Sequence, residues 1–272
     1  MPREREFRFT EKDFEWIRSK VTRETGIKLE ASKDQMVYSR LARRLRALGL
    51  PDFDSYRKVL DNDDGEEMGE FVNALTTNLT AFFREPHHFD HLMEVLQGLQ
   101  ERSIRIWSGG CSSGEEPYSI AMTALEALGE EARDRVIITA TDLDSSVVRR
   151  GERGVYDMDR LSGVSDRYRK RYFLKGTGKN TGKVRVKPAV REMVHFSTLN
   201  LLHEWPFQER FHIVFCRNTV IYFNKDVQTE LFKRMYRQTL PGAWLYIGHS
   251  ESLWKVTKQF VSHGRTVYQR VD

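Results

Sequence analysis

Two acidic residues directly after a glycine-rich turn are the residues of this chain best placed to do chemistry. The segment 104–122 reads IRIWSGGCSSGEEPYSIAM, so that Gly109 and Gly110 are soon followed by Glu115 and Glu116. Glycines let the backbone turn sharply and approach a ligand closely. Carboxylates repel phosphates, so this turn favours a ligand without phosphates and suits a cationic one. The spacing is not the G-x-G-x-x-G of dinucleotide sites, and a plain turn between strand and helix is the alternative.

Another acidic residue follows the next apolar run. Residues 135–141 (RVIITAT) are typical of a buried parallel strand, and Asp142 comes directly after them. A carboxylate at the end of this strand is where α/β nucleotide sites bind ribose hydroxyls. Its separation from the glycine turn exceeds the roughly 20 residues usual in the dinucleotide family, which argues against NAD. A helix N-cap is the alternative role, and Asp144 is the better candidate for it.

The elements that must hold these residues predict an α/β domain. Residues 103–107 predict a short buried strand, and Pro117 suits the start of a helix. Residues 194–200 and 211–216 predict further strands, and residues 243–252 and 266–271 predict a closing antiparallel hairpin at the sheet edge. A second hairpin around GTGKNTG, residues 176–182, interrupts the α/β order and would present an exposed edge.

The first eighty or so residues predict helices only. Thr10 with Asp13 resembles a capping box. A predicted helix over 33–48 has an apolar face that contains Val37, Leu41, Leu45 and Leu48. Its arginines, which have no acidic neighbours in the helix, are Arg40, Arg43 and Arg44 on another face and Arg46 further round. Such a row favours docking on an acidic helix or on nucleic acid, and a solvated basic face is the alternative.

The segment TTNLTAFFREPHHF, residues 76–89, joins the two parts. Polar Asn78, Thr80 and Arg84 flank a pair of phenylalanines, and a simple linker is the alternative reading. His87 and His91 are four residues apart on the helix that follows and could suggest a metal. No third ligand follows at a metal-site spacing, so no metal is predicted.

Composition is that of a globular protein with a basic balance. The 272 residues include 44 Lys and Arg against 39 Asp and Glu, giving a net charge of +5, which permits an anionic partner without identifying one. No apolar run approaches the roughly 18 residues of a membrane span, and the N-terminus is charged, unlike a signal peptide. Cys111 and Cys216 are predicted to be buried reduced thiols, which suits a cytoplasmic location.

Six stretches together resemble the CheR-type chemotaxis receptor methyltransferases: TTNLTAFFRE, IRIWSGGCSSGEEPYSIAM, TATDLDSSVVRRGERGVY, FSTLNLL, FCRNTVIYF and LPGAWLYIGHSESL. The resemblance implies methyl transfer from S-adenosyl-L-methionine (SAM) to glutamates of bacterial chemoreceptors, giving γ-glutamyl methyl esters and S-adenosyl-L-homocysteine. It implies a helical N-terminal domain over 1–75, a linker over 76–90 that contributes to the cofactor site, and a Rossmann-like methyltransferase domain over 91–272. A small antiparallel β-subdomain is expected as an insertion at about 172–196.

The resemblance also implies a set of site residues. The predicted SAM-binding residues are Asn78, Thr80, Arg84, Gly109, Glu115, Asp142, Asn200, Leu201, Arg217 and Asn218. Arg84 and Tyr222 match the residues nearest the reacting methyl. The arginines predicted to dock on the receptor are Arg40, Arg43, Arg44 and Arg46. The loop with Gly176, Gly178 and Gly182 resembles one that binds a receptor's C-terminal pentapeptide in some members. Two departures are mild: Gly110 replaces a frequent alanine, and Thr219 replaces a usually apolar residue.

Transfer to a carboxylate requires no general base, because glutamate with a reference pKa of about 4.3 is already ionised at pH 7. The absence of a Ser-His-Asp or Cys-His pattern fits that reaction. Arg84 is predicted to position substrate and cofactor, and Tyr222 to orient through its hydroxyl. One alternative is a methyltransferase acting on RNA or a small molecule, although no nucleic-acid partner is predicted. Another is a SAM-sensing module without catalysis. Contact with a membrane is predicted only through the receptor.

Overall fold

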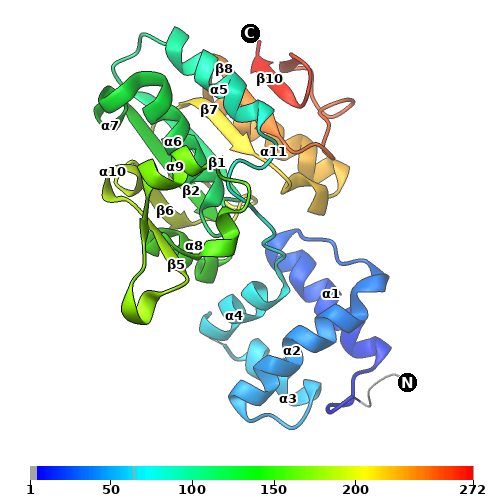
Figure 1. Ribbon diagram of the computed structural model, residues 1–272. Coiled ribbons are helices and arrows are strands. Elements are labelled where there is room, and N and C mark those ends of the chain that lie inside the picture. Colours follow the sequence, from blue (N-terminus) through cyan, green and yellow to red (C-terminus); the bar gives the residue numbers. More distant parts are fainter. Residues whose placement is uncertain (1–4, 64, 272) are drawn as a thin grey trace. The chain divides into compact units, whose positions relative to one another are not determined.

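The computed structural model describes residues 5–63 and 65–271, which fall into two compact units (Figure 1). One unit is Met1–Thr77 with Tyr222–Asn224, and the other is Asn78–Ile221 with Lys225–Asp272. None of the helices in the described ranges is long and apolar enough to cross a membrane.

The first unit is helical, as its sequence predicts. Its helices are α1 (Glu11–Thr25), the 3-10 helix η1 (Ala31–Lys33), α2 (Asp34–Leu48), α3 (Phe53–Asp61) and α4 (Glu66–Leu75). The predicted capping box of Thr10 and Asp13 is present, and Gly26 ends α1 in the left-handed conformation. Val37, Leu41 and Leu45 are fully buried, because they recur at helical spacing on one face of α2. Leu48 was expected on that face but is 40% exposed, since it lies at the last position of the helix.

The second unit is an α/β domain. Its helices are α5 (His87–Gly98), α6 (Glu115–Leu128), α7 (Ala132–Arg135), α8 (Ser145–Arg153), α9 (Asp166–Tyr172), α10 (Pro188–Arg191) and α11 (Lys225–Gln238). Its strands are β1 (Ile104–Gly109), β2 (Val136–Asp142), β3 (Val155–Asp157), β4 (Phe173–Lys175), β5 (Lys183–Val186), β6 (Val194–Thr198), β7 (Phe211–Cys216), β8 (Thr239–Ile247), β9 (Phe260–Ser262) and β10 (Val267–Arg270). Short 3-10 helices are η2 (Gly129–Glu131), η3 (Met158–Leu161), η4 (Gly178–Asn180) and η5 (Val220–Tyr222).

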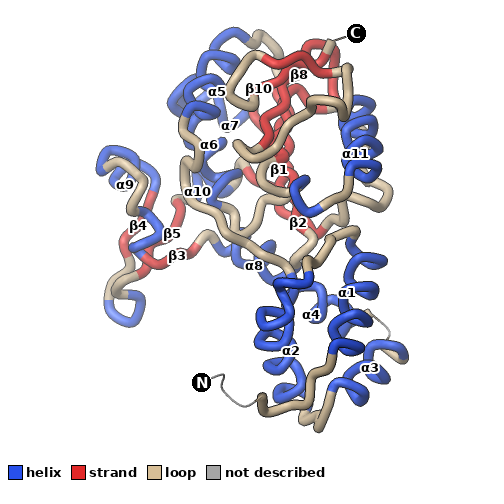
Figure 2. Tube along the Cα trace, turned by 90° about the vertical axis from the view of Figure 1, so that its right-hand side faces the viewer, coloured by secondary structure: helices blue, strands red, loops and turns tan. Residues whose placement is uncertain are grey.

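Seven strands form the main sheet in the order β6-β2-β1-β7-β8-β10-β9. The pairs from β6 to β8 are parallel, and β10 and β9 continue the sheet antiparallel. Helices α5 and α6 lie on one side of this sheet and α11 on the other (Figure 2). The chain moves outward from β1 through β2 to β6 and then returns to β7 on the other side of β1. Ligands of α/β proteins bind at such a reversal, beyond the carboxyl ends of the strands.

A separate three-stranded sheet has the order β3-β5-β4 and projects away from the main sheet (Figure 2). The antiparallel pairing of β4 with β5 confirms the hairpin expected around residues 176–182. The sheet extends over Val155–Val186, whereas the expected insertion covered about 172–196; β3 lies before that range, and β6 belongs to the main sheet. The closing pair β8 and β10 is antiparallel as predicted, but β9 lies between them in sequence and forms the sheet edge.

Candidate cofactor site

The glycine turn after β1 is attached to the end of β2. The backbone N–H groups of Gly110 and Cys111 both donate to the Thr141 carbonyl, at 2.8 and 2.9 Å. The turn needs left-handed backbone at Gly110, with φ +80°, and at Ser112, with φ +50°. It thereby brings the carboxyl ends of β1 and β2 together at the start of α6.

Asp142 lies at the last position of β2 and faces this turn. Its Oδ2 accepts the Ser112 N–H at 2.8 Å and its Oδ1 accepts the Asp144 N–H at 2.9 Å. Burial raises the pKa of Asp142 to about 6, although the backbone donors stabilise the ionised form. Asp144 is the N-cap of α8, as predicted. Asp142 therefore caps no helix, and its carboxylate oxygens keep lone pairs for a ligand.

The linker after Thr77 is bound to the same strand ends. Asn78 donates from Nδ2 to Asp144 at 2.7 Å, and the Asn78 carbonyl accepts the Ser112 hydroxyl at 3.1 Å. The Arg84 guanidinium donates to the Leu79 carbonyl at 3.0 Å. Three predicted SAM-binding segments, namely the linker, the glycine turn and the end of β2, are thus brought together in one network.

Glu115 is fully buried, and its charge is balanced by an arginine from the inserted segment. The Arg160 Nε donates to Glu115 Oε1 at 3.1 Å and the Arg160 Nη2 to the Thr80 carbonyl at 2.8 Å, while the Ser113 hydroxyl donates to the other carboxylate oxygen at 2.7 Å. Arg160 was not predicted as a site residue. It lies on η3, 45 residues after its partner, and nothing local in the sequence links the two. The only signal was the requirement that a buried carboxylate be paired.

A second buried cation, Arg217 at the end of β7, joins three segments. It donates to Glu116 Oε2 at 2.9 Å and to the Arg84 carbonyl at 2.5 Å, and its Nη2 lies 3.4 Å from Glu85 Oε2. The Arg217 side chain is 2% exposed. Burial opposes ionisation of Glu85, but His249 and Arg217 hold its pKa down at about 2. Arg217 therefore fixes the linker to β7, and its contact with SAM stays a prediction.

Glu251, which was not predicted either, holds the loop after β7. Its carboxylate is 6% exposed and accepts four backbone N–H bonds, from Gly248 at 2.5 Å, Asn218 at 2.9 Å, Val220 at 2.9 Å and Ile221 at 3.3 Å. Asn218 has φ +57°. Four donors converging on one carboxylate keep the predicted SAM-binding residue Asn218 in that left-handed conformation.

Replacing Glu251 by glutamine is expected to lower the free energy of unfolding by about 1–3 kcal/mol and to weaken SAM binding. The new amide NH₂ would face backbone N–H groups, so one pair of donors would lose its acceptor. Urea unfolding and calorimetric titration with SAM measure the two effects. Glu230→Gln, on an exposed position of α11, is the matched control. An unchanged SAM affinity in Glu251→Gln would remove the positioning role.

Glu85, His87 and His88 are the described residues whose ligand atoms gather closely enough for a metal ion, within 4.8 Å of one another. Of the two histidines considered from the sequence, His87 belongs to this cluster and its Nε2 lies 3.0 Å from the Arg265 carbonyl oxygen, whereas His91 Nδ1 lies 2.8 Å from the Tyr246 hydroxyl. Arg217 already provides a positive charge beside Glu85. A cation there would be repelled by that guanidinium, so the cluster fits a hydrogen-bonded junction better than a metal centre.

The remaining predicted site residues are Tyr222, Asn200 and Leu201. Tyr222 belongs to the first unit, where its carbonyl accepts the Lys28 N–H at 3.1 Å. Asn200 Oδ1 accepts the Leu202 N–H at 2.9 Å in the loop after β6, and Leu201 is buried there. That loop is attached to the site by the Leu199 N–H, which donates to the Asp142 carbonyl at 2.9 Å.

The fold supplies the α2 arginines with acidic partners from distant segments, although they have no acidic neighbours within the helix. Arg44 pairs with Glu67 and Glu70 of α4, and Arg46 pairs with Glu6. The Arg40 guanidinium donates to the carbonyls of Ala74 and Thr76. Arg43 is exposed. Within unit 1, only Arg43 of the four predicted docking arginines has no hydrogen bond or ion pair among the described residues.

The two departures from the family pattern are in contact with each other. A Cβ added to Gly110 would lie 2.2 Å from Thr219 Oγ1. That hydroxyl donates to the Arg217 carbonyl at 3.1 Å, which holds its rotamer. The glycine and the threonine therefore fit as a pair. Gly109, predicted to bind SAM, lies above the Trp107 ring, whose atoms would be 3.3 Å from an added Cβ.

The chemistry of these strand ends fits SAM. SAM carries a sulfonium and an ammonium group, and four buried carboxylates surround the turn: Glu115, Glu116, Asp142 and Asp144. Each glutamate is paired with an arginine, whereas Asp142 accepts only backbone N–H groups. Asp142 is thus the carboxylate with capacity for ribose hydroxyls or for the field of a cationic ligand.

Comparison with known proteins agrees with this geometry. A family model described as "CheR methyltransferase, SAM binding domain" matches residues 78–269, and one described as "CheR methyltransferase, all-alpha domain" matches residues 12–76. The chain is 46% identical to the chemotaxis protein methyltransferase 2 of Pseudomonas aeruginosa, covering 97% of this chain and 94% of the relative. It is 40% identical to the chemotaxis protein methyltransferase of Escherichia coli, covering 94% and 89%.

Proposed function

The chain belongs to the CheR methyltransferase family, and from this premise we propose that it transfers a methyl group from SAM to glutamate side chains of chemoreceptors. The observation that carries the proposal is the network at the carboxyl ends of β1 and β2. There Asn78, the glycine turn and Asp142 are joined within one unit, and the SAM-binding family model covers that unit. Methyl transfer to receptor domains that face the cytoplasm would place the site of action in the cytoplasm.

SAM, when bound, supplies the methyl group: a glutamate oxygen forms the new C–O bond as the carbon–sulfur bond breaks, and the electron pair leaves with sulfur. The products are a neutral methyl ester and S-adenosyl-L-homocysteine, with no proton transferred. The chain must therefore align the reactants and exclude water. Asp142 would accept the ribose hydroxyls, while the Glu115–Arg160 pair would keep the linker carbonyl at Thr80 in place.

Arg84 and Tyr222 are proposed to act nearest the reacting methyl. Tyr222→Phe is expected to lower kcat about tenfold while leaving the Kd for SAM near normal, because one orienting hydrogen bond of about 1.4 kcal/mol is lost in the transition state. Steady-state kinetics and calorimetric titration separate the two quantities. Tyr236→Phe on α11 is the control. A loss confined to SAM affinity would contradict the assigned role.

The receptor-docking surface is proposed to centre on Arg43, which is exposed and, unlike the exposed Arg46, makes no ion pair among the described residues. Because Arg44 and Arg46 are paired within the chain, we expect them to contribute less to receptor binding.

The loop with Gly176, Gly178 and Gly182 is proposed as a peptide-tether site. An Ala at position 176 would place its Cβ 2.1 Å from the Asn180 carbonyl oxygen, so the loop shape depends on this glycine, and the neighbouring strand β4 is an edge of its sheet.

Transfer of labelled methyl from SAM to chemoreceptor-containing membranes, followed by alkali, tests the proposal. Label released as methanol is expected, because carboxyl methyl esters hydrolyse in alkali. Label that stays attached would indicate methylation at nitrogen or another atom and overturn the glutamate assignment. Incorporation into RNA in place of the receptors would support the competing substrate class. SAM binding without incorporation into any receptor offered would favour a module without catalysis.

A further inference from the structure

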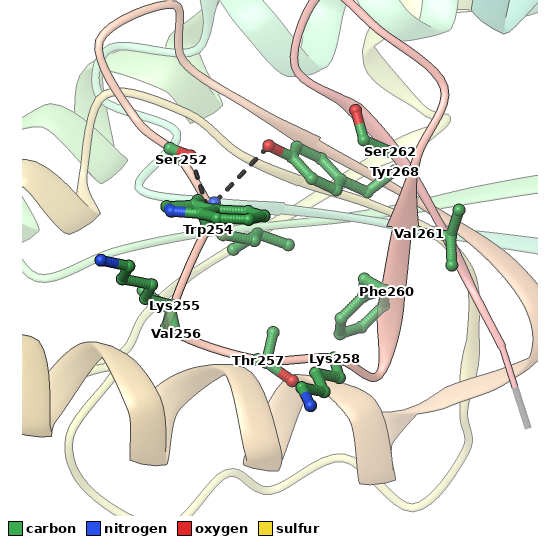
Figure 3. Close-up of a pocket in the computed structure, with 11 residues that line it drawn as sticks. Ser252, Trp254, Lys255, Val256, Thr257, Lys258, Phe260, Val261, Ser262 and Tyr268 are labelled. Carbon is green, nitrogen blue, oxygen red and sulfur yellow. Dashed lines mark hydrogen bonds between the residues drawn. The ribbon is translucent and has the colours of Figure 1, made fainter.

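A cavity of about 850 Å³ lies between the loop after β8 and the edge strand β9, entirely within the second unit. Figure 3 shows Trp254 and Phe260 on opposite sides of it, with Tyr268 near its upper end and Thr257 below. The cavity is separate from the glycine turn and from the small sheet, since residues of neither line it. The catalytic proposal does not use it.

The walls of this cavity are apolar, and its mouth bears an exposed indole. Leu253, Val256 and Phe260 are buried by the protein itself, whereas Trp254 is 78% exposed. The backbone around the indole is fixed: the Trp254 N–H donates to the Ser252 hydroxyl at 3.1 Å, and the Leu253 N–H lies 3.5 Å from the Tyr268 hydroxyl. A large aromatic side chain that is exposed to water beside an apolar cavity is typical of a residue that anchors a protein–protein interface.

An open strand edge runs beside the cavity. Strand β9 is the last strand of the main sheet and pairs on one side with β10, through Phe260 with Arg270 and Ser262 with Tyr268. In the described part of the chain no strand pairs with its other side. Unpaired backbone groups at a sheet edge can form hydrogen bonds with an extended peptide. A small ligand could not use this row of backbone groups.

The charged side chains that line the cavity have one sign. Residues 252–271 contain Lys255, Lys258, Arg265 and Arg270 and no acidic residue. Lys255 and Lys258 line the cavity and are exposed, and none of the ion pairs found among the described residues involves either. Unpaired cations beside an apolar cavity favour a partner that carries negative charge next to a large apolar side chain.

We propose that this cavity, with Trp254, Lys255 and Lys258, is a docking site for an acidic peptide segment of a partner protein. One large apolar side chain of the segment enters the cavity and packs on Trp254, and flanking carboxylates face the two lysines. The adjoining edge of β9 provides backbone hydrogen bonds to the extended segment. This site is additional to the arginines of α2 and to the glycine loop of the small sheet.

The test uses the full chain and a fluorescein-labelled peptide with a Leu-Phe pair between two runs of four glutamates. Fluorescence anisotropy is expected to show saturable binding. Trp254→Ala is expected to weaken it at least about tenfold, with Trp254→Phe recovering part of the loss. Lys255→Glu combined with Lys258→Glu is expected to weaken it about tenfold and to reduce its salt dependence. Arg102→Glu, an exposed change before β1, is the matched control and should bind as the unchanged chain does.

Two further peptides separate specific docking from charge attraction. A peptide with Ser-Ser in place of Leu-Phe should bind at least about tenfold more weakly, and one with glutamines in place of the glutamates likewise. Equal binding of the Ser-Ser peptide, or Trp254→Ala binding like the unchanged chain, would overturn the proposal. Sedimentation tests the other candidate occupant, a second copy of this chain. Self-association that Trp254→Ala abolishes, together with no peptide binding, would assign the cavity to that second copy instead.

Discussion

Replacing Arg217 by methionine is expected to lower the free energy of unfolding by about 3–5 kcal/mol, because the change leaves buried carboxylates without their cation. Arg217 pairs with Glu116 at 2.9 Å and lies 3.4 Å from Glu85, and its own side chain is 2% exposed. Methionine fills a similar volume, so the loss measures the uncompensated charge more than a cavity. The linker should also loosen, since its Arg84 carbonyl loses a donor.

Urea unfolding followed by circular dichroism measures this change, with the exposed Arg102→Met as the control. Combining Arg217→Met with Glu116→Gln should recover at least about 1 kcal/mol, because the double variant removes one of the stranded charges. A loss below about 1 kcal/mol in the single variant would contradict the assignment. So would a double variant less stable than the single one.

Replacing Asp142 by alanine is expected to weaken SAM binding by about 1–3 kcal/mol, roughly ten- to a hundredfold in Kd. The Asp142 carboxylate accepts only backbone N–H groups, and those of Ser112 and Asp144 hold it in place. Isothermal titration with SAM gives the change in Kd. Asp166→Ala, at the exposed start of α9, is the control. Unchanged affinity in Asp142→Ala would remove this residue from the site.

The same carboxylate should make SAM binding depend on pH. Its pKa is raised to about 6 in the free protein, mainly by burial. SAM has a net positive charge near neutral pH and stabilises the ionised form, so binding lowers this pKa. Affinity is therefore full above about pH 6 and falls as the pH drops below it. Titrations between pH 5 and 7.5 should show the fall in the unchanged chain and a flatter profile in Asp142→Ala.

Residues that act through local chain geometry could be predicted from the sequence. The capping box at Thr10, the N-cap at Asp144 and the position of Asp142 at the end of a buried strand depend on neighbours within a few residues. Periodicity likewise predicted the buried face of α2. The limits of the inserted sheet were harder to predict, because β3 and β4 are three residues long and show little hydrophobic alternation.

The partners of buried charges could not be predicted, since they come from distant segments. Arg160 reaches Glu115 across 45 positions, and Glu251 reaches the backbone of Asn218 across 33. Composition requires a buried acid to be paired, yet it does not say with which cation or which backbone donors. The same reasoning explains the α2 arginines, whose acidic neighbours on α4 are close in space and not in the helix sequence.

The contact between Gly110 and Thr219 restricts the order in which substitutions can accumulate. An alanine at position 110 would place its methyl 2.2 Å from the threonine hydroxyl, which is held by the Arg217 carbonyl. An apolar side chain at 219 has no such bond and is free to rotate away. A lineage that carries this pair is therefore expected to lose the threonine before it gains the alanine. The two positions form an epistatic pair, and a chimera that imports only the alanine from an alanine-bearing relative should fold less well than one that imports both residues.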